Sequence, residues 1–213
     1  MRRAIPIMAL AGLVAALAAT PALAAQSNTY TVKAKVTRAG VKFAYTVAER
    51  AGQQPAAVKR YTIGFGRMRA NTTHFAKGAL VGKGTISSYV YLSNDPSGAG
   101  GFTCTKDLKI YSAGRNRARL VLTGNPARCG GVGDLPPIPA KFVPFAGHGT
   151  ALQFDVPPNV LHPVPGLTVA VRSVGSSLKA GYMSPIGSAS AHRPVAVTFL
   201  TEAGQSSTVR TTT

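Results

Sequence analysis

Acidic residues are scarce in this chain, which has 6 Asp and Glu against 24 Lys and Arg. A glycosidase needs two facing carboxylates, so the shortage argues against that class of enzyme. Asp95 and Asp134 lie in Gly- and Pro-rich segments and are interpreted as turn-forming residues. Asp107 and Asp155 lie in or beside apolar stretches. An extracellular hydrolase built on these two carboxylates is therefore kept as an alternative hypothesis.

Motifs typical of other enzymes and of metal sites are also missing. No Gly-x-Ser-x-Gly elbow occurs, and the histidines have no close metal-ligand spacing. The segment Gly78–Thr85 has three residues, where a phosphate-binding loop has four, between its first Gly and the Gly-Lys pair. We interpret it instead as a tight bend where two backbones approach each other. The prediction is no catalytic residue, no metal and no cofactor. The histidines are His74, His148, His162 and His192.

Long apolar runs are missing after the first 25 residues, which have the pattern of a Sec signal peptide. Arg2 and Arg3 precede an apolar stretch, and Ala22-Leu23-Ala24 matches a cleavage site near Ala24-Ala25. A membrane anchor is the alternative, because Ile5 to Leu23 nearly reaches a spanning length. The stretch is rich in Ala, however, and no basic cluster follows it. We expect a secreted protein with residues 1–25 removed, 26–213 as one domain, and no transmembrane segment in the mature chain.

The chain has two cysteines, Cys104 and Cys129, and both lie in the part predicted to be exported. Neither is accompanied by residues that would activate a nucleophilic thiol. An even number in an oxidising compartment predicts one disulfide between them. Closing a loop of this length stabilises a fold by roughly 3 kcal/mol.

Positive charge is what the chain has in excess. Removing the leader leaves 22 Lys and Arg and a formal charge of about +16, and 18 of these cations lie between Lys33 and Lys141. Outside a cell such a charge attracts anionic wall polymers or glycans. Binding to a specific nucleic acid is not expected. The alternative is that the charge only keeps the protein soluble. Alternating arginines predict guanidinium rows suited to phosphate or carboxylate groups, or else a solvated strand face. These candidate polyanion-binding residues are Arg115, Arg117, Arg119, Arg67 and Arg69.

Apolar residues at every second position predict strands along most of the chain. Thr150–Val156 and Leu167–Val174 are predicted to face each other across Pro157–Gly166. Four prolines there predict a stiff crossing loop that is neither helix nor central strand. Further strands are predicted at Lys59–Phe65 and Gly78–Leu92. Hairpins are predicted within Asn28–Val47, between Phe102–Tyr111 and Arg117–Leu122 with a turn at Gly114 and Asn116, and between Pro194–Leu200 and Ser207–Thr213.

About nine short strands, 23 Gly, 15 Pro and no amphipathic helix after the leader predict an all-β chain. The predicted architecture is an immunoglobulin-like antiparallel β-sandwich. Lys33, Lys35 and Lys42 alternate with apolar residues in the first hairpin. We expect them to protect an edge strand from aggregation, in preference to forming a binding stripe.

An ordered series of short motifs runs from Tyr61 to Val209: GALVGKGT, CTKDLKIY, GTALQFDVP, LHPVPGL, GYMSPIG, RPVAVTFL and EAGQSSTV. The series resembles a group of secreted, uncharacterised β-sandwich proteins of high-GC Gram-positive bacteria (actinobacteria). The group is expected to have Cys near a VGxGT segment, which is Val81–Thr85 in this chain, and near a GY segment, which is Gly181–Tyr182. This chain has Ala76 or Lys77 and Gly187 or Ser188 there, so at least one disulfide would be missing. The resemblance implies an extracellular immunoglobulin-like sandwich and no known activity.

These observations predict a secreted, non-catalytic protein of the cell envelope that binds anionic wall polymer or glycan through a basic surface. Two alternatives belong to other classes. One is the carboxylate hydrolase, and the other is a structural component of a surface assembly, which would need an exposed apolar patch or an open sheet edge.

Overall fold

The computed structural model describes residues 29–37, 40–48, 56–95, 100–124, 126–146, 148–187 and 193–212, and their regular secondary structure is almost entirely β-strand. The all-β prediction is confirmed. The elements are β1 (Thr29–Thr37), β2 (Gly40–Ala48), β3 (Val58–Phe65), β4 (Met68–Ala70), η1 (Thr72–His74), β5 (Leu80–Leu92), β6 (Phe102–Ser112), β7 (Arg117–Thr123), η2 (Pro126–Arg128), β8 (Ile138–Phe145), β9 (Gly149–Asp155), α1 (Pro158–Leu161), β10 (Leu167–Lys179), β11 (Met183–Pro185), β12 (Pro194–Thr201) and β13 (Ser206–Thr212).

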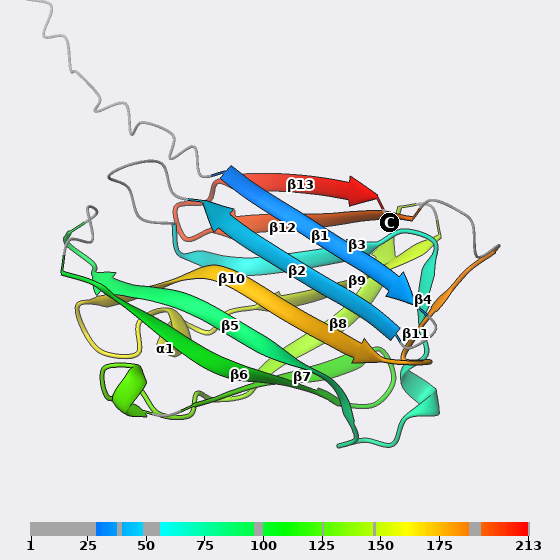
Figure 1. The fold of residues 1–213 in the computed structure, drawn as a ribbon, viewed down its shortest axis with the longest axis horizontal. Helices are drawn as coiled ribbons and strands as arrows, with labels where there is room; N and C mark the ends of the chain where they lie inside the picture. The colour runs from blue at the N-terminus through cyan, green and yellow to red at the C-terminus, as the bar shows by residue number, and fades with distance from the viewer. Residues whose placement is uncertain are drawn as a thin grey trace, which may run out of the picture.

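Eleven of these strands form one antiparallel sheet in the order β1-β2-β10-β5-β6-β7-β8-β9-β3-β12-β13, and β4 pairs with β11 in a small second sheet. The end strands β1 and β13 lie side by side, so the large sheet curls into a barrel-like shape (Figure 1). The immunoglobulin-like sandwich predicted from the sequence is not confirmed. Two separate sheets would be needed, but β10 pairs with both β2 and β5, and β3 pairs with both β9 and β12.

The curl follows from an apolar inner face. In β2, Val41, Phe43, Tyr45 and Val47 are buried while the residues between them are partly or fully exposed. The same alternation recurs along β6, β7 and β8. Because successive side chains of a strand point to opposite faces, bending the sheet around its apolar face buries that face.

Aromatic side chains join the two sides of the curled sheet where β2 faces β3. The ring of Tyr45 lies 6.1 Å from that of Tyr61 and 5.3 Å from that of Phe199 in β12. The hydroxyls of Tyr45 and Tyr61 are 3.2 Å apart and share a hydrogen bond. Phe43 and Phe65 meet edge to face at 6.0 Å. Packing of side chains therefore closes the structure here.

The predicted local pairings are confirmed. β1 pairs with β2, β6 with β7, and β12 with β13. Asn116 and Gly114 both have positive φ, as the predicted turn between β6 and β7 requires. Two backbones approach each other closely at Gly84, as predicted for this segment, because the carbonyl oxygen of Gly175 occupies the space that a Cβ would need.

The proline connector after β9 is only partly as predicted. It does cross between β9 and β10, but it contains the short helix α1, which the prediction had excluded. Pro157 and Pro158 lie at the start of α1, where a missing N–H costs nothing, and the Pro157 carbonyl accepts from the N–H of Val160 at 2.8 Å. β8 was not predicted as a strand.

The predicted signal peptide, residues 1–25, lies outside the described residues. Within the part that is described, no helix is long and apolar enough to cross a membrane.

Cys104 and Cys129 form a disulfide, as predicted, with their Cα atoms 4.7 Å apart. It connects β6 to the segment after η2. Both cysteines are buried against Val90.

Replacing both cysteines with serine is expected to lower the free energy of unfolding by about 3 kcal/mol, because the unfolded chain gains the freedom of the opened loop. For a domain of this size the thermal midpoint would fall by about 10 °C. Calorimetry of the oxidised protein and the double variant measures the change. A reducing agent should destabilise the native protein similarly and leave the variant unaffected. An unchanged midpoint in the variant would contradict the expectation.

Candidate functional site

Four lysines form a row across the outer face of the sheet. Lys35 of β1 is directly opposite Lys42 of β2, which pairs in turn with Ser177 of β10. Ser177 pairs with Lys83 of β5, and Lys83 is directly opposite Lys109 of β6. All four lysines are exposed. Four inter-strand steps give the row a length of about 19 Å along the sheet.

Two of the predicted arginines extend this row. Arg119 of β7 is a diagonal neighbour of Lys109, and its guanidinium lies 5.6 Å from the ring centre of Tyr111. Arg117 lies two residues further along the same face and is directly opposite Lys141 of β8. We call this set the basic strip: Lys35, Lys42, Lys83, Lys109, Arg119, Arg117 and Lys141.

The other three predicted arginines lie elsewhere. Arg115 is exposed in the turn before β7, next to the end of the strip. Arg67 is exposed with a positive φ just before β4. Arg69 lies within β4, and its Nε donates to Asn71 Oδ1 at 3.2 Å. Because β4 belongs to the small second sheet, Arg67 and Arg69 are not part of the strip.

The described carboxylates form no ion pair with the strip, although exposed Asp107 lies on the same face of β6, two residues from Lys109 and diagonal to Lys83. Arg60 donates from Nη2 to Asp155 Oδ2 at 3.2 Å and from Nε to Oδ1, while Glu202 pairs with His162. Asp134 accepts from the N–H of Gly124. Within the described part of the chain, no ion pair involves a residue of the strip.

The two acids suspected of hydrolase chemistry are not brought together. Asp107 lies on β6 and Asp155 at the end of β9, both exposed. β7 and β8 lie between them, which makes three inter-strand spacings, or about 14 Å along the sheet. Paired catalytic carboxylates of glycosidases are roughly 5–10 Å apart. Among the described residues, no group of three or more His, Cys, Asp or Glu could hold a metal ion.

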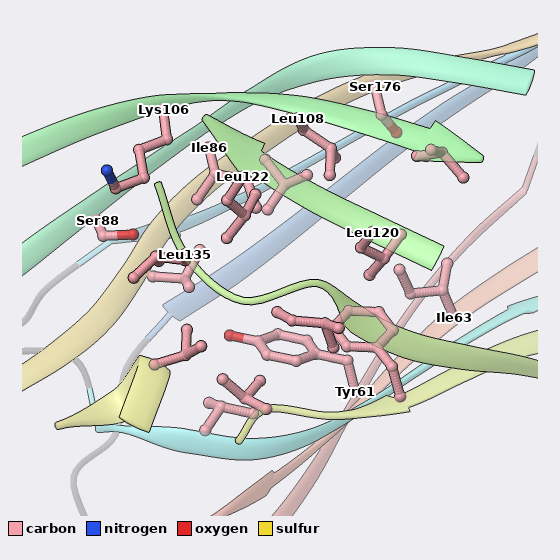
Figure 2. A pocket seen from close by; sticks show the side chains of 18 of the residues that line it. Tyr61, Ile63, Ile86, Ser88, Lys106, Leu108, Leu120, Leu122, Leu135 and Ser176 are labelled. Carbon is pink, nitrogen blue, oxygen red and sulfur yellow. The ribbon is translucent and has the colours of Figure 1, made fainter. Parts of the chain in front are cut away.

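Inside the curled sheet, apolar side chains surround a cavity of about 110 Å³. Figure 2 shows Lys106, Ser88 and Leu135 toward one side of this cavity and Ile63 and Leu120 toward the other. Lys106 is buried, and its Nζ donates to the carbonyl oxygens of Val132 at 2.9 Å and Gly133 at 2.6 Å. Burial lowers the pKa of Lys106, partly offset by the charge of Asp134. This ammonium therefore holds the segment between η2 and β8 in place.

His162 connects the segment after α1 to the turn between β12 and β13. Its Nε2 lies 2.9 Å from Glu202 Oε1, and its Nδ1 lies 3.0 Å from the carbonyl oxygen of Leu167. Both ring nitrogens thus face acceptors, so only the protonated imidazolium can donate both hydrogen bonds. The hydrogen bond to Glu202 raises the pKa of His162, with burial acting in the opposite direction. His162 therefore has a structural role, joining two segments through its ring nitrogens.

The lysine row was missed in the sequence. The sequence interpretation of Lys35 and Lys42 favoured protection of an edge strand over a binding stripe, and β1 is indeed an end strand of the sheet. Lys83 and Lys109 alternate with apolar neighbours along β5 and β6 and could have been placed on an outer face. Their alignment with Lys35 depends on the pairing of β10 with β2 and β5, which local patterns do not reveal.

Comparison of the chain with protein-family models, with curated proteins and with solved structures found no match.

The contact between His162 and Glu202 is expected to make stability depend on pH. Because the folded-state pKa of His162 is raised above its ordinary value of 6.5, the stabilisation is complete below that value and is lost as pH rises through the folded-state pKa. Both side chains are more than a third exposed, so the loss should be about 0.5 kcal/mol.

Chemical unfolding at a series of pH values, compared between the native protein and Glu202→Gln, isolates this contribution. The native protein should lose its advantage over the variant above the folded-state pKa of His162. A difference that stays constant across neutral pH would show that His162 is not protonated in this contact.

Proposed function

We propose that this protein is a secreted, non-catalytic binding protein of the cell envelope that docks on anionic wall polymers or acidic glycans through the basic strip. The observation that carries the proposal is the lysine row. Lys35 is directly opposite Lys42, and Lys83 is directly opposite Lys109, without an ion-paired carboxylate.

Direct cross-strand pairs of like charge destabilise a sheet, so such a row carries a cost for folding. A chain of phosphate or carboxylate groups lying across the strands would relieve this repulsion. Because a ligand that binds only the folded state stabilises that state, the polymer should also raise the thermal midpoint. A strand face that is merely solvated requires no alignment of like charges. A linear polyanion, in contrast, is complementary to a row of aligned cations.

Export is part of the proposal. It is supported by the predicted signal peptide, residues 1–25, and by the Cys104–Cys129 disulfide, since such bonds persist mainly in oxidising compartments. Outside the cell, the abundant polyanions are wall polymers and acidic glycans.

The test replaces Lys35, Lys42, Lys83 and Lys109 together with glutamine and measures binding to purified wall polymer and to heparin as salt is raised. If each lysine contacts one anionic group, the slope of log affinity against log salt concentration should become shallower by about 3. The matched control replaces four exposed cations outside the strip with glutamine, and so removes the same charge. These are Arg67, Lys77, Arg128 and Arg210.

A smaller loss of polymer binding in the control variant than in the strip variant supports the proposal. Equal losses in the two variants would mean that binding responds only to net charge, and the strip would then have no special role. Binding of the native protein that does not weaken with salt would also contradict the proposal.

A further inference from the structure

The interior cavity lies inside the curled sheet and does not depend on the basic strip. Its lining comes from β2, β3 and β5 to β10, which are eight strands that follow one another in the sheet. At one end the lining reaches Val90 and Cys104, which belong to a small apolar cluster separate from the main core. The cavity volume of about 110 Å³ is of the same order as an engineered apolar cavity of about 150 Å³ that binds benzene.

Two polar side chains lie on the inner face of the sheet beside this small cluster. Ser88 of β5 is directly opposite Cys104 of β6, and Ile86 is directly opposite Lys106. Ser88 and Lys106 are therefore diagonal neighbours, a separation that a long side chain can bridge. Figure 2 shows both at the same end of the cavity. Only 8% of Ser88 and 5% of Lys106 is exposed, so both belong to the interior.

The hydroxyl of Ser88 is available to a molecule in the cavity. It forms no hydrogen bond with any of the described residues. Unlike the hydroxyl of Tyr182, which is wholly enclosed by the protein, it keeps a small accessible surface. Because Ser88 lies on the inner face of β5 and lines the cavity, that surface opens into the cavity (Figure 2). Polar groups at this depth normally have a hydrogen-bond partner.

Lys106 supplies a positive charge beside this hydroxyl. An ammonium group has three hydrogens to donate, and the carbonyl oxygens of Val132 at 2.9 Å and Gly133 at 2.6 Å accept two of them. Among the described residues, no carboxylate forms an ion pair with Lys106. Burial lowers the pKa of Lys106, and the charge of Asp134 offsets this only in part. A buried charge without a counter-charge is unfavourable, and an anion in the cavity would supply one.

We propose that the cavity is a binding site for a small aliphatic carboxylate, whose oxygens accept from the third hydrogen of Lys106 Nζ and from the Ser88 hydroxyl. The alkyl chain would lie among apolar lining residues such as Ile86 and Val174 and gain from leaving water. The volume limits the ligand to about six non-hydrogen atoms, the size of benzene. A neutral ligand would leave the ammonium uncompensated, and a cation would be repelled by it.

The test titrates the full chain with butanoate and with butanamide at neutral pH. The two have nearly the same shape, but only butanoate is charged. Both should show magnetisation transfer to the methyl groups of Ile86 and Val174 in NMR spectra, and butanoate should bind more tightly. In Lys106→Met, which keeps most of the apolar stem, the ratio of the butanoate affinity to the butanamide affinity should fall about tenfold, the value of one hydrogen bond to a charged group.

Ser88→Ala should lower the affinity for butanoate about fivefold, the value of one weaker hydrogen bond. It should not lower the thermal midpoint, because the hydroxyl has no partner among the described residues. The matched controls are Ser87→Ala, at the neighbouring position on the other face of β5, and Lys179→Met, at an exposed position of β10 outside the strip. Both should bind butanoate like the native protein.

If Lys106→Met fails to fold because the segment that it holds is released, the affinity of Ser88→Ala still decides. Butanoate that reaches no interior methyl group of the native protein, even if it associates with the basic surface, would overturn the proposal. An affinity ratio that Lys106→Met leaves unchanged would do the same, as would a butanoate affinity that Ser88→Ala leaves unchanged. None of these outcomes bears on the binding of polyanions to the strip.

Discussion

The structure depends on a contact between side chains at the place where the sheet meets itself. Tyr45 of β2, Tyr61 of β3 and Phe199 of β12 pack within about 6 Å of one another and hold the two ends of an eleven-stranded sheet together. Aromatic pairs of this kind contribute roughly 1 kcal/mol each beyond the area that they bury. Once the sheet is closed in this way, every strand has an inner and an outer face. The lysine row and the cavity are then two results of the same alternation.

Local patterns predicted the strands well, because the alternation of apolar and polar residues reflects burial of one face. They also predicted the hairpins, whose partners are close in sequence, and the disulfide between Cys104 and Cys129. The pairing of β10 with β2 and of β3 with β9 joins distant segments, and it turns an expected two-sheet sandwich into one curled sheet. β8 contains Pro139 and Pro144, and because proline is unusual within a strand the sequence pattern did not indicate one here. α1 was excluded for the same reason, although proline is well tolerated at the start of a helix.

In the candidate sites too, features that depend on local spacing could be predicted, and features that depend on pairing between distant strands could not. Arg117 and Arg119 could be placed on one strand face from their spacing alone, and they lie there. The alignment of Lys35 with Lys109 needed the register of four strand pairs. Predicting the cavity would have required the whole fold, because its lining comes from eight strands and its volume depends on how the sheet curls. Tyr182 follows Gly181, within a segment where no alternation of apolar and polar residues marked it as part of the core.

The strand order also has a consequence for how the chain folds. Tyr45 in the first hairpin is aligned with Val174 in β10, and Val197 in β12 with Ile63 in β3, so the outer parts of the sheet join segments from opposite ends of the chain. Contacts between distant segments slow folding, because much chain entropy is lost before they form. Within the sheet β2 has no hydrogen-bonded partner other than β1 until β10 has been synthesised, and Tyr45 lacks its contact with Phe199 until β12 follows. A chain with this topology completes its folding only after nearly all of it is available, and it needs protection from aggregation in the meantime.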